Sequence, residues 1–183
     1  MSDAIANWRW RSLADGGLEH VAVKATAAGV TAEGVTIAGT GTEGYGLRTR
    51  ITAEPEWAGF RGLHLTRLAG PTVALRHDGM GGWTDSEGKA RKEFDGVFDL
   101  MLDGSAIWLT SMVRRAAWKA GAEKAVDVVR VAVPSLEIRR DTLKITAVEP
   151  GRLYRIVGET GEEEIALDEA GYLVGWTGRF ERV

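Results

Sequence analysis

The residues of this sequence that could do acid–base or metal chemistry are few and scattered. Its three histidines, His20, His64 and His77, stand in separate segments, and no two have the spacing of metal ligands. His77 could form a dyad with Asp78, but Asp before Gly79 is typical of a tight turn. The chain has no cysteine, nucleophile elbow, phosphate-binding loop or dinucleotide fingerprint. We therefore expect no catalytic residue, no metal site and no cofactor.

Arginines are the side chains best suited to meet a ligand head group. Arg48 and Arg50 share one face of an alternating segment, and Arg76 lies beside a glycine-rich hairpin. Arg114 and Arg115 follow an apolar run, and in a strand only one of the two could face inward. An arginine inside a barrel is costly unless it is paired or meets an anionic or hydroxyl-rich ligand. The alternative is that alternation directs these arginines to solvent.

Tryptophan is unusually frequent, with seven residues against three tyrosines. An indole offers a flat face and an N–H donor to sugars or apolar tails, although most large aromatic residues of a small β domain belong to its core. Trp83, at the hairpin, and Trp108, in the apolar run, are the candidates for ligand contact. The complete predicted binding set is Arg48, Arg50, Arg76, Asp78, Trp83, Trp108, Arg114, Arg115, Tyr154 and Trp176.

Short strands are predicted along almost the whole chain, because apolar and polar residues alternate between clusters of turn formers. So many antiparallel strands in one sheet would curl or close. We expect a mainly β fold, with a strongly curved antiparallel sheet that forms an incomplete barrel. The predicted strands are 7–13, 18–25, 30–37, 47–52, 60–68, 72–77, 125–133, 136–148, 153–157, 163–167, 172–176 and 179–183.

The segment 76–118 differs from its surroundings. Its first part contains Asp78-Gly79 and Gly81-Gly82, which are typical of a hairpin. Beyond Asp103-Gly104, Ser105 is a candidate cap for a short helix that carries Trp108. We expect this segment to form a helical cover over the open side of the sheet.

Composition narrows the class of protein. A chain of 183 residues with 44% hydrophobic residues fits one β-barrel-like domain, 1–183. The net charge of −3 argues against nucleic acid as a partner. The beginning of the chain lacks the pattern of a secretory signal, and no apolar run approaches the ~20 residues of a transmembrane segment. A soluble cytoplasmic protein is the simplest interpretation.

Several stretches from Leu47 onward resemble the putative glycolipid-binding family of bacterial proteins of unknown function. They are LRTRITAEPEW, LRHDGMGGWTD, FDGVFDLMLDG, VRRAAW, VVRVAVPSLEI, YRI and LDEAGYLVGWTGRFERV. The resemblance implies a fold similar to the bacterial lipoprotein-carrier proteins, an incomplete antiparallel barrel with helical segments over its open side. The polar Thr-Asn and prolines of the family are replaced by Ala106, Trp108, Leu109 and Met112, which implies a more apolar cavity at that end.

Two functions follow, and the preferred one is non-enzymatic binding of an amphiphile, such as a glycolipid or an acyl-bearing small molecule, in the concave cavity. Trp83 and Trp108 would contact its apolar or ring portion, with Arg48, Arg76 and Arg115 near its head group. The alternative is a cofactor-independent enzyme of secondary metabolism, since a pigment-biosynthesis enzyme has a similar fold. A module that binds another protein, or forms a homodimer, is left open.

Overall fold

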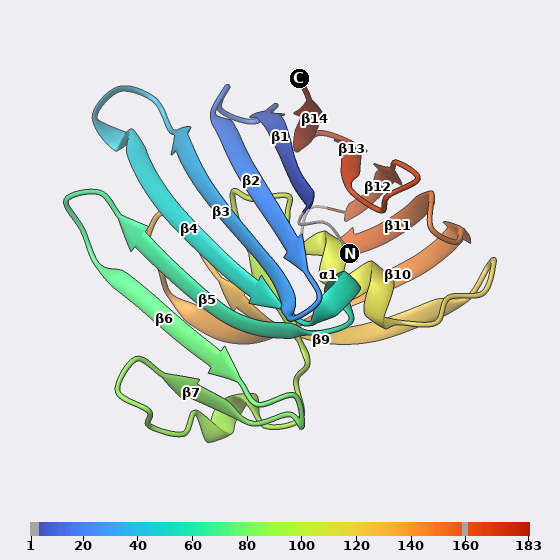
Figure 1. Cartoon of the computed structure of the whole chain (residues 1–183). Helices are drawn as coiled ribbons and strands as arrows, with labels where there is room; N and C mark the ends of the chain where they lie inside the picture. Colours follow the sequence, from blue (N-terminus) through green and yellow to red (C-terminus); the bar gives the residue numbers. More distant parts are fainter. Residues whose placement is uncertain (1–3, 159–160) are drawn as a thin grey trace.

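One curved sheet of 14 strands dominates the computed structural model, which describes residues 4–158 and 161–183 (Figure 1). The predicted mainly β fold is confirmed. The strands are β1 (Ala4–Ser12), β2 (Leu18–Thr26), β3 (Gly29–Ala38), β4 (Tyr45–Ala53), β5 (Phe60–Arg67), β6 (Thr72–His77), β7 (Trp83–Asp85), β8 (Asp99–Leu102), β9 (Glu123–Val131), β10 (Ile138–Glu149), β11 (Leu153–Gly158), β12 (Gly161–Leu167), β13 (Leu173–Trp176) and β14 (Phe180–Arg182).

The first and last strands meet in the middle of the sheet. The spatial order is β7 to β1 followed by β14 to β8, so the chain runs outward on one side and returns from the other edge. Every pair of neighbours is antiparallel except β8 and β9, which are parallel. The expected incomplete barrel is confirmed, because β7 and β8 are free edges that do not pair with each other in the described part of the chain, and the sheet is therefore not a closed barrel.

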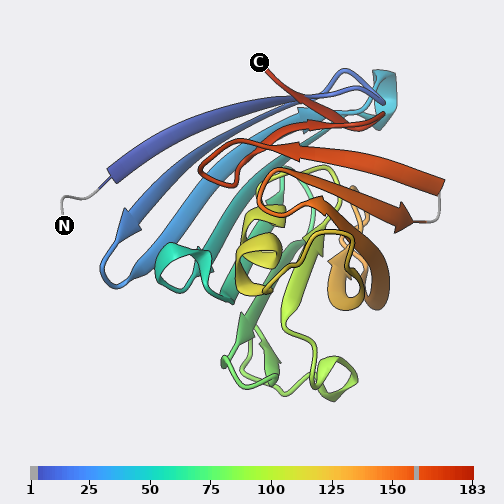
Figure 2. The ribbon, with the colours of Figure 1, turned by 90° about the vertical axis from the view of Figure 1, so that its right-hand side faces the viewer.

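The helix α1 (Leu109–Arg115) lies on the concave side of the sheet, as Figure 2 shows, and its position confirms the predicted helical cover. Residues 109–113 are all buried, and α1 packs against β8 and the 3-10 helix η2 (Pro55–Trp57). Ser105 does not cap α1, because its hydroxyl is bonded to Glu19 instead. No helix of the described residues has the length and apolar character needed to cross a membrane.

Strict alternation gives the sheet an inner face and an outer face. In β4, Leu47, Thr49 and Ile51 are buried, whereas Arg48 and Arg50 are exposed. Successive side chains of a strand point to opposite sides, so the inner face collects the apolar set. Residues that pair directly across two neighbouring strands lie on the same face of the sheet. The partners of these β4 residues in β3 and β5 therefore face the same way as the β4 residues themselves.

Large aromatic side chains fill much of the interior. Trp10, Trp57 and Trp83 are at most 2% exposed, and Trp10 donates its indole N–H to the carbonyl of Leu173 at 2.9 Å. This hydrogen bond joins β1 to β13.

Candidate ligand-binding cleft

A cleft of about 470 Å³ enters the interior where β11 separates from β10. The described pairing of these strands ends at Lys144 and Val157, so the first half of β10 continues without β11 beside it. The volume lies within the ~300–1,000 Å³ of small-molecule sites. We call this site the inner cleft, and it is lined by Ala14, Met101, Arg130, Asp141, Thr142, Leu143, Ile156, Val157, Glu163, Trp176, Gly178 and Arg179.

The floor of the inner cleft is apolar. Met101 from β8, Leu143 from β10, Ile156 from β11 and Trp176 from β13 are each at most 5% exposed. Trp108 supports the floor from below, because its ring meets that of Trp176 edge-on at a centroid distance of 6.0 Å. An apolar chain laid on this floor would be held by contact area rather than by directed bonds.

Arg130, on β9, is the centre of the first charged cluster at the rim. Its Nε lies 3.1 and 3.0 Å from the two carboxylate oxygens of Asp103, and its Nη1 donates to Asp141 at 3.0 Å. Arg139 reaches the same oxygen of Asp141 at 3.5 Å. Burial raises the pKa of Asp103, and the positive charge of Arg130 offsets part of that rise. The cluster is held in place by its own ion pairs.

Glu163 is the centre of the second charged cluster, on the opposite side of the floor. One of its carboxylate oxygens accepts from Arg179 Nε at 2.6 Å and from Trp176 Nε1 at 2.6 Å. The Arg179 guanidinium lies 4.9 Å from the centre of the Trp176 ring. Glu163 therefore anchors both the indole of the floor and the cation above it.

The two clusters together balance in charge and offer both donors and acceptors. Guanidinium groups only donate and carboxylates only accept, whereas a hydroxyl group does both. An anionic ligand group would face carboxylates already paired with the arginines, but an uncharged hydroxylated group could bond to both partners. In the described residues, three arginines, Arg130, Arg139 and Arg179, stand with three carboxylates, Asp103, Asp141 and Glu163.

Glu19 is a buried carboxyl group that the sequence analysis missed. It lines a side pocket of about 190 Å³ that shares Ala14 and Arg179 with the inner cleft. Its two oxygens accept from Ser105 Oγ at 2.5 Å and from the backbone N–H of Ala106 at 2.9 Å. Burial raises its pKa to about 7.

A sequence signal for Glu19 existed in the alternation of β2. Glu19 shares a face with Val21 and Val23, and both valines are almost completely buried. A carboxyl group in register with an apolar face is expected to be buried and to need hydrogen-bond partners. Those partners come from residues 86 and 87 positions away in the chain.

The predicted aromatic residues lie in the core, where they differ in their distance from the inner cleft. Trp176 lines the cleft and Trp108 lies directly beneath it. Trp83 is far away, stacked on Phe60, and donates its indole N–H to the carbonyl of Val97 at 2.7 Å. The buried hydroxyl of Tyr154 accepts from the N–H of Gly151 at 2.8 Å.

Arg114 and Arg115 connect α1 to its surroundings. Arg114 donates to the carbonyl of Glu56 at 3.2 Å and to that of Ala170, which links η2 to the β12–β13 turn. Arg115 forms a two-bond ion pair with Asp99, at 3.2 Å through Nε and at 2.5 Å through Nη2. The Asp99 side chain is 1% exposed, so Arg115 neutralises an otherwise unpaired buried charge.

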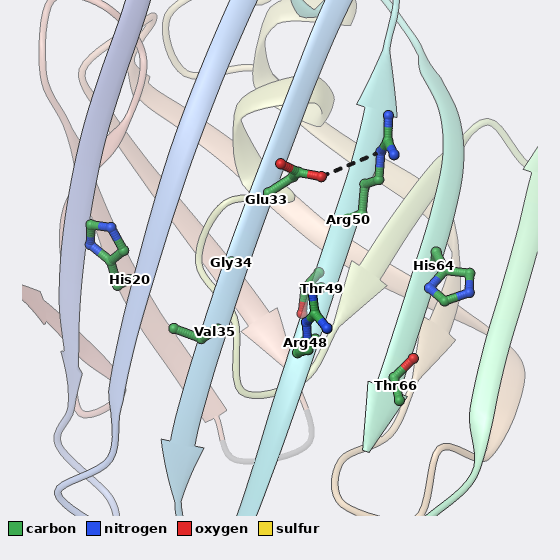
Figure 3. Close-up of a pocket in the computed structure, with 9 residues that line it drawn as sticks. All are labelled: His20, Glu33, Gly34, Val35, Arg48, Thr49, Arg50, His64 and Thr66. Carbon is green, nitrogen blue, oxygen red and sulfur yellow. Dashed lines mark ion pairs between the residues drawn. The ribbon is translucent and has the colours of Figure 1, made fainter. Parts of the chain in front are cut away.

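The other polar residues of the predicted set lie outside the inner cleft. Arg48, Arg50 and Arg76 point outward from β4 and β6, and Figure 3 shows the first two beside a groove on the outer face. Asp78 accepts from the N–H groups of Met80 and Gly82 at 2.6 and 2.9 Å, which closes the glycine turn. Of the ten predicted residues, the structure brings only Trp108 and Trp176 to the inner cleft.

Metal coordination has no support in residues 4–158 and 161–183, where no three His, Asp or Glu side chains are grouped to hold an ion. The lining residues of the inner cleft offer charge-assisted hydrogen bonds and apolar contact. The side pocket adds one carboxyl group that can change its protonation near neutral pH.

Comparison with known proteins gives a family and a fold. The family model described as "Putative glycolipid-binding" matches residues 7–182. A crystal structure of a DUF1089 family protein from Pseudomonas aeruginosa aligns with a TM-score of 0.78 and 24% sequence identity, over 91% of this chain and 92% of that chain. At this identity the alignment shows a common fold. A comparison with curated proteins finds no match.

Proposed function

The chain belongs to the putative glycolipid-binding family, whose model covers residues 7–182, and from that membership we propose that it binds an amphiphile in the inner cleft. The apolar part of the ligand lies on the floor made by Met101, Leu143, Ile156 and Trp176. Its head group is uncharged, carries hydroxyl groups and meets the two charged clusters at the rim. The protein is a binder in this proposal, in which the residues of the cleft contact the ligand without reacting with it.

The charge balance of the rim is the observation that carries this proposal. An anionic head group would have to compete with Asp141 and Glu163 for arginines they already hold at 3.0 and 2.6 Å. A sugar hydroxyl can accept from a guanidinium and donate to the neighbouring carboxylate without breaking either pair. The family description and the chemistry of the rim therefore favour the same class of head group.

The floor would supply most of the affinity. Each methylene group of the ligand that is buried contributes about 0.8 kcal/mol before the cost of ordering is subtracted. Head-group contacts then decide which amphiphile is retained, because an unmatched buried polar group lowers affinity more than a matched one raises it. The expected selectivity is for head group rather than for chain length.

A series of alkyl compounds with one chain and different head groups tests this proposal. Tryptophan fluorescence would be followed during titration with octyl glucoside and octyl phosphate, both kept below micelle formation. We expect the glucoside to bind more tightly, and Glu163→Gln to weaken it by about tenfold, because a bond to a charged acceptor is lost. Glu162→Gln is the matched control, since Glu162 is the next residue and pairs with Arg155 on the outer face.

Two results would overturn the proposal. One is equal or tighter binding of octyl phosphate, which would contradict the selection of an uncharged head group. The other is an unchanged affinity for octyl glucoside in Glu163→Gln, because the contact would then lie elsewhere. Thermal unfolding of both variants identifies any loss of affinity that is caused by loss of structure.

A catalytic function has one observation in its favour, the Glu19 carboxyl group in the side pocket. A pKa of about 7 suits a group that takes up and releases a proton near neutral pH. Mass spectrometry of a ligand that co-purifies with Glu19→Gln would test this alternative. Conversion of that ligand when wild-type protein is added would support an enzyme, and recovery of the unaltered ligand would contradict it.

A further inference from the structure

The outer face of β1–β6 has a charge pattern that the inner cleft does not explain. Alternation directs Arg9, Arg11, Arg48, Arg50 and Arg76 outward, and all five side chains are exposed. Cross-strand pairing places Arg9, His20, Val35 and Arg48 side by side in one row across β1–β4. The cations therefore lie on one face of the sheet, with Arg9 and Arg48 separated in this row by His20 and Val35.

This surface, which we call the basic face, opposes the charge of the whole chain. At the outward positions of β1–β6, the described residues include five arginines and Lys24 but only one acidic residue, Glu33. The complete chain has a net charge of −3. Positive potential is therefore concentrated on one side of an otherwise acidic protein.

Two of the five arginines of the basic face form ion pairs with described residues, and one of them is Arg11, which lies 3.2 Å from Glu181 with both side chains about half exposed. Arg9, Arg48 and Arg76 form no ion pair or side-chain hydrogen bond with another described residue. Arg50 lies 3.8 Å from Glu33, and the two side chains are 59% and 65% exposed, so water and salt screen their attraction. The guanidinium groups remain accessible to anions from solution.

Exposed aliphatic side chains lie on the same face as these cations. Ile5 and Ile37 are 69% and 73% exposed, and Leu18 pairs directly with Ile37 across β2 and β3. Leu68 covers Gly46 in the next strand, beside Ile37. Exposed aliphatic groups among cations are typical of surfaces that rest in the head-group region of a bilayer.

A groove of about 420 Å³ crosses the centre of the basic face (Figure 3). Arg48 and Arg50 from β4 border it together with His20 from β2 and His64 from β5. Two guanidinium groups two positions apart on one strand point to the same side, so both can meet the oxygens of one phosphate group. The groove gives the basic face a place for a phosphate-bearing head group.

The basic face favours lipid over nucleic acid as the source of that anion. Proteins that hold single strands stack bases on aromatic side chains. The described outward positions of β1–β6 carry no Phe, Tyr or Trp, and carry exposed aliphatic groups instead. An anionic bilayer can contact both the cations and the aliphatic groups favourably, whereas a nucleic acid gains binding energy only from the cations.

We propose that the basic face docks the protein onto a membrane surface that contains anionic phospholipids. This step rests on the proposed function, because an amphiphile held in the inner cleft would be collected from or delivered to such a surface. The basic face and the inner cleft lie on opposite faces of the sheet. The two binding events therefore use different residues and can be removed separately.

Vesicle flotation tests the docking with the full chain. Vesicles of phosphatidylcholine alone and of phosphatidylcholine with phosphatidylglycerol would be compared at about 0.1 M and about 1 M salt, where the screening length falls from about 10 to about 3 Å. We expect binding only to the anionic vesicles and its loss at high salt. The variant combines Arg9→Gln, Arg48→Gln and Arg76→Gln and should bind about 100-fold more weakly, at about fivefold for each cation.

The matched control combines Arg140→Gln, Lys144→Gln and Arg155→Gln, which remove three cations from the outer side of β10 and β11. Its binding should stay within about threefold of wild type, since these three cations lie away from the basic face, and Arg140 and Arg155 are already paired with Asp127 and Glu162. Equal binding to neutral vesicles, an unchanged affinity in the first variant or an equal loss in the control would each overturn the docking. Tighter binding to a single-stranded DNA than to anionic vesicles would also overturn it.

Failure of docking and failure of the proposed function give different results. If the inner cleft binds an amphiphile, the variant of the basic face should retain wild-type affinity for octyl glucoside. Loss of vesicle binding with this affinity unchanged supports the docking. If wild-type protein floats with anionic vesicles but does not bind octyl glucoside, the proposed ligand binding in the inner cleft is refuted and the proposed docking of the basic face is supported.

Discussion

The inner cleft and the basic face are both rich in arginine, but the arginines of the cleft are ion-paired, whereas most of those on the basic face form no ion pair with a described residue. Arg130 and Arg179 each lie within 3.1 Å of a carboxylate and are at most 30% exposed. Arg48 and Arg76 are exposed and form no ion pair with a described residue. Low-dielectric surroundings require a partner for a charge, whereas water does not.

The role of an arginine in a binding site therefore depends on its burial and on its ion-pair partners, and it does not follow from the residue type alone. Paired arginines inside the sheet make a neutral, hydrogen-bonding surface that suits an uncharged polar group. Unpaired arginines outside make a field that attracts anions over a distance set by salt. Substitutions on the two faces should therefore have different consequences for stability and for binding.

Removing a mostly buried cation should have the largest effect. Arg130→Leu leaves Asp103 without its partner, whereas Asp141 keeps Arg139, and we expect the free energy of unfolding to fall by about 3 kcal/mol, the lower end of the range for a broken buried pair. Chemical denaturation measures this change. Arg140→Leu is the control on the outer side of β10, where the pair with Asp127 is about half exposed, and its loss should stay below about 1 kcal/mol. Equal losses of unfolding free energy in the two variants would contradict the proposed difference between the inner and outer ion pairs.

The buried carboxyl group of Glu19 should make the stability of the protein depend on pH. The folded state holds the Glu19 proton up to a pKa of about 7, whereas an unfolded glutamate has a value near 4.5. The stabilisation is therefore complete below pH 4.5 and lost as the pH rises through 7, for a total of about 3 kcal/mol. Glu19→Gln should remove this component from the pH profile, as measured by denaturation at several pH values.

An exposed acid provides the control for that profile. Glu33→Gln removes a carboxylate of the outer face whose side chain is 65% exposed, and it is the variant measured beside Glu19→Gln. A profile of Glu19→Gln that is parallel to wild type between pH 4.5 and 8 would show that Glu19 titrates as an ordinary surface glutamate.

The smallest effect on stability is expected at the unpaired arginines. Arg48→Gln and Arg76→Gln break no ion pair with a described residue, and each should change the free energy of unfolding by less than about 0.5 kcal/mol. Thermal unfolding measures this change. A large loss of stability in either variant would mean that the basic face has a structural role that outweighs any role in docking.

Much of the fold could be predicted because the period of two is a local property of the chain. Twelve of the strands lie where alternation and turn formers indicate them, and β7 falls in the predicted hairpin. β8 was missed because all four of its residues are buried, so Asp99–Leu102 has no alternation to detect. Its parallel pairing with β9 depends on how α1 crosses the sheet, which no local pattern records.

The candidate site was less predictable because its residues come from distant parts of the chain. The rim joins Asp103 to Arg130 and Glu163 to Arg179, and these contacts depend on the order of strands in the sheet. Residue type drew attention to arginine and tryptophan, and both residue types line the inner cleft. It could not tell Arg48, which faces solvent, from Arg130, which faces the inner cleft.

A crystal structure of the protein soaked with octyl glucoside tests the central claim most directly. The account predicts the alkyl chain against Leu143, Ile156 and Trp176, with the glucose hydroxyls within hydrogen-bond distance of Glu163 and Arg179. A glucoside bound only on the outer face, or an inner cleft that remains closed to it at saturating concentration, would contradict the account.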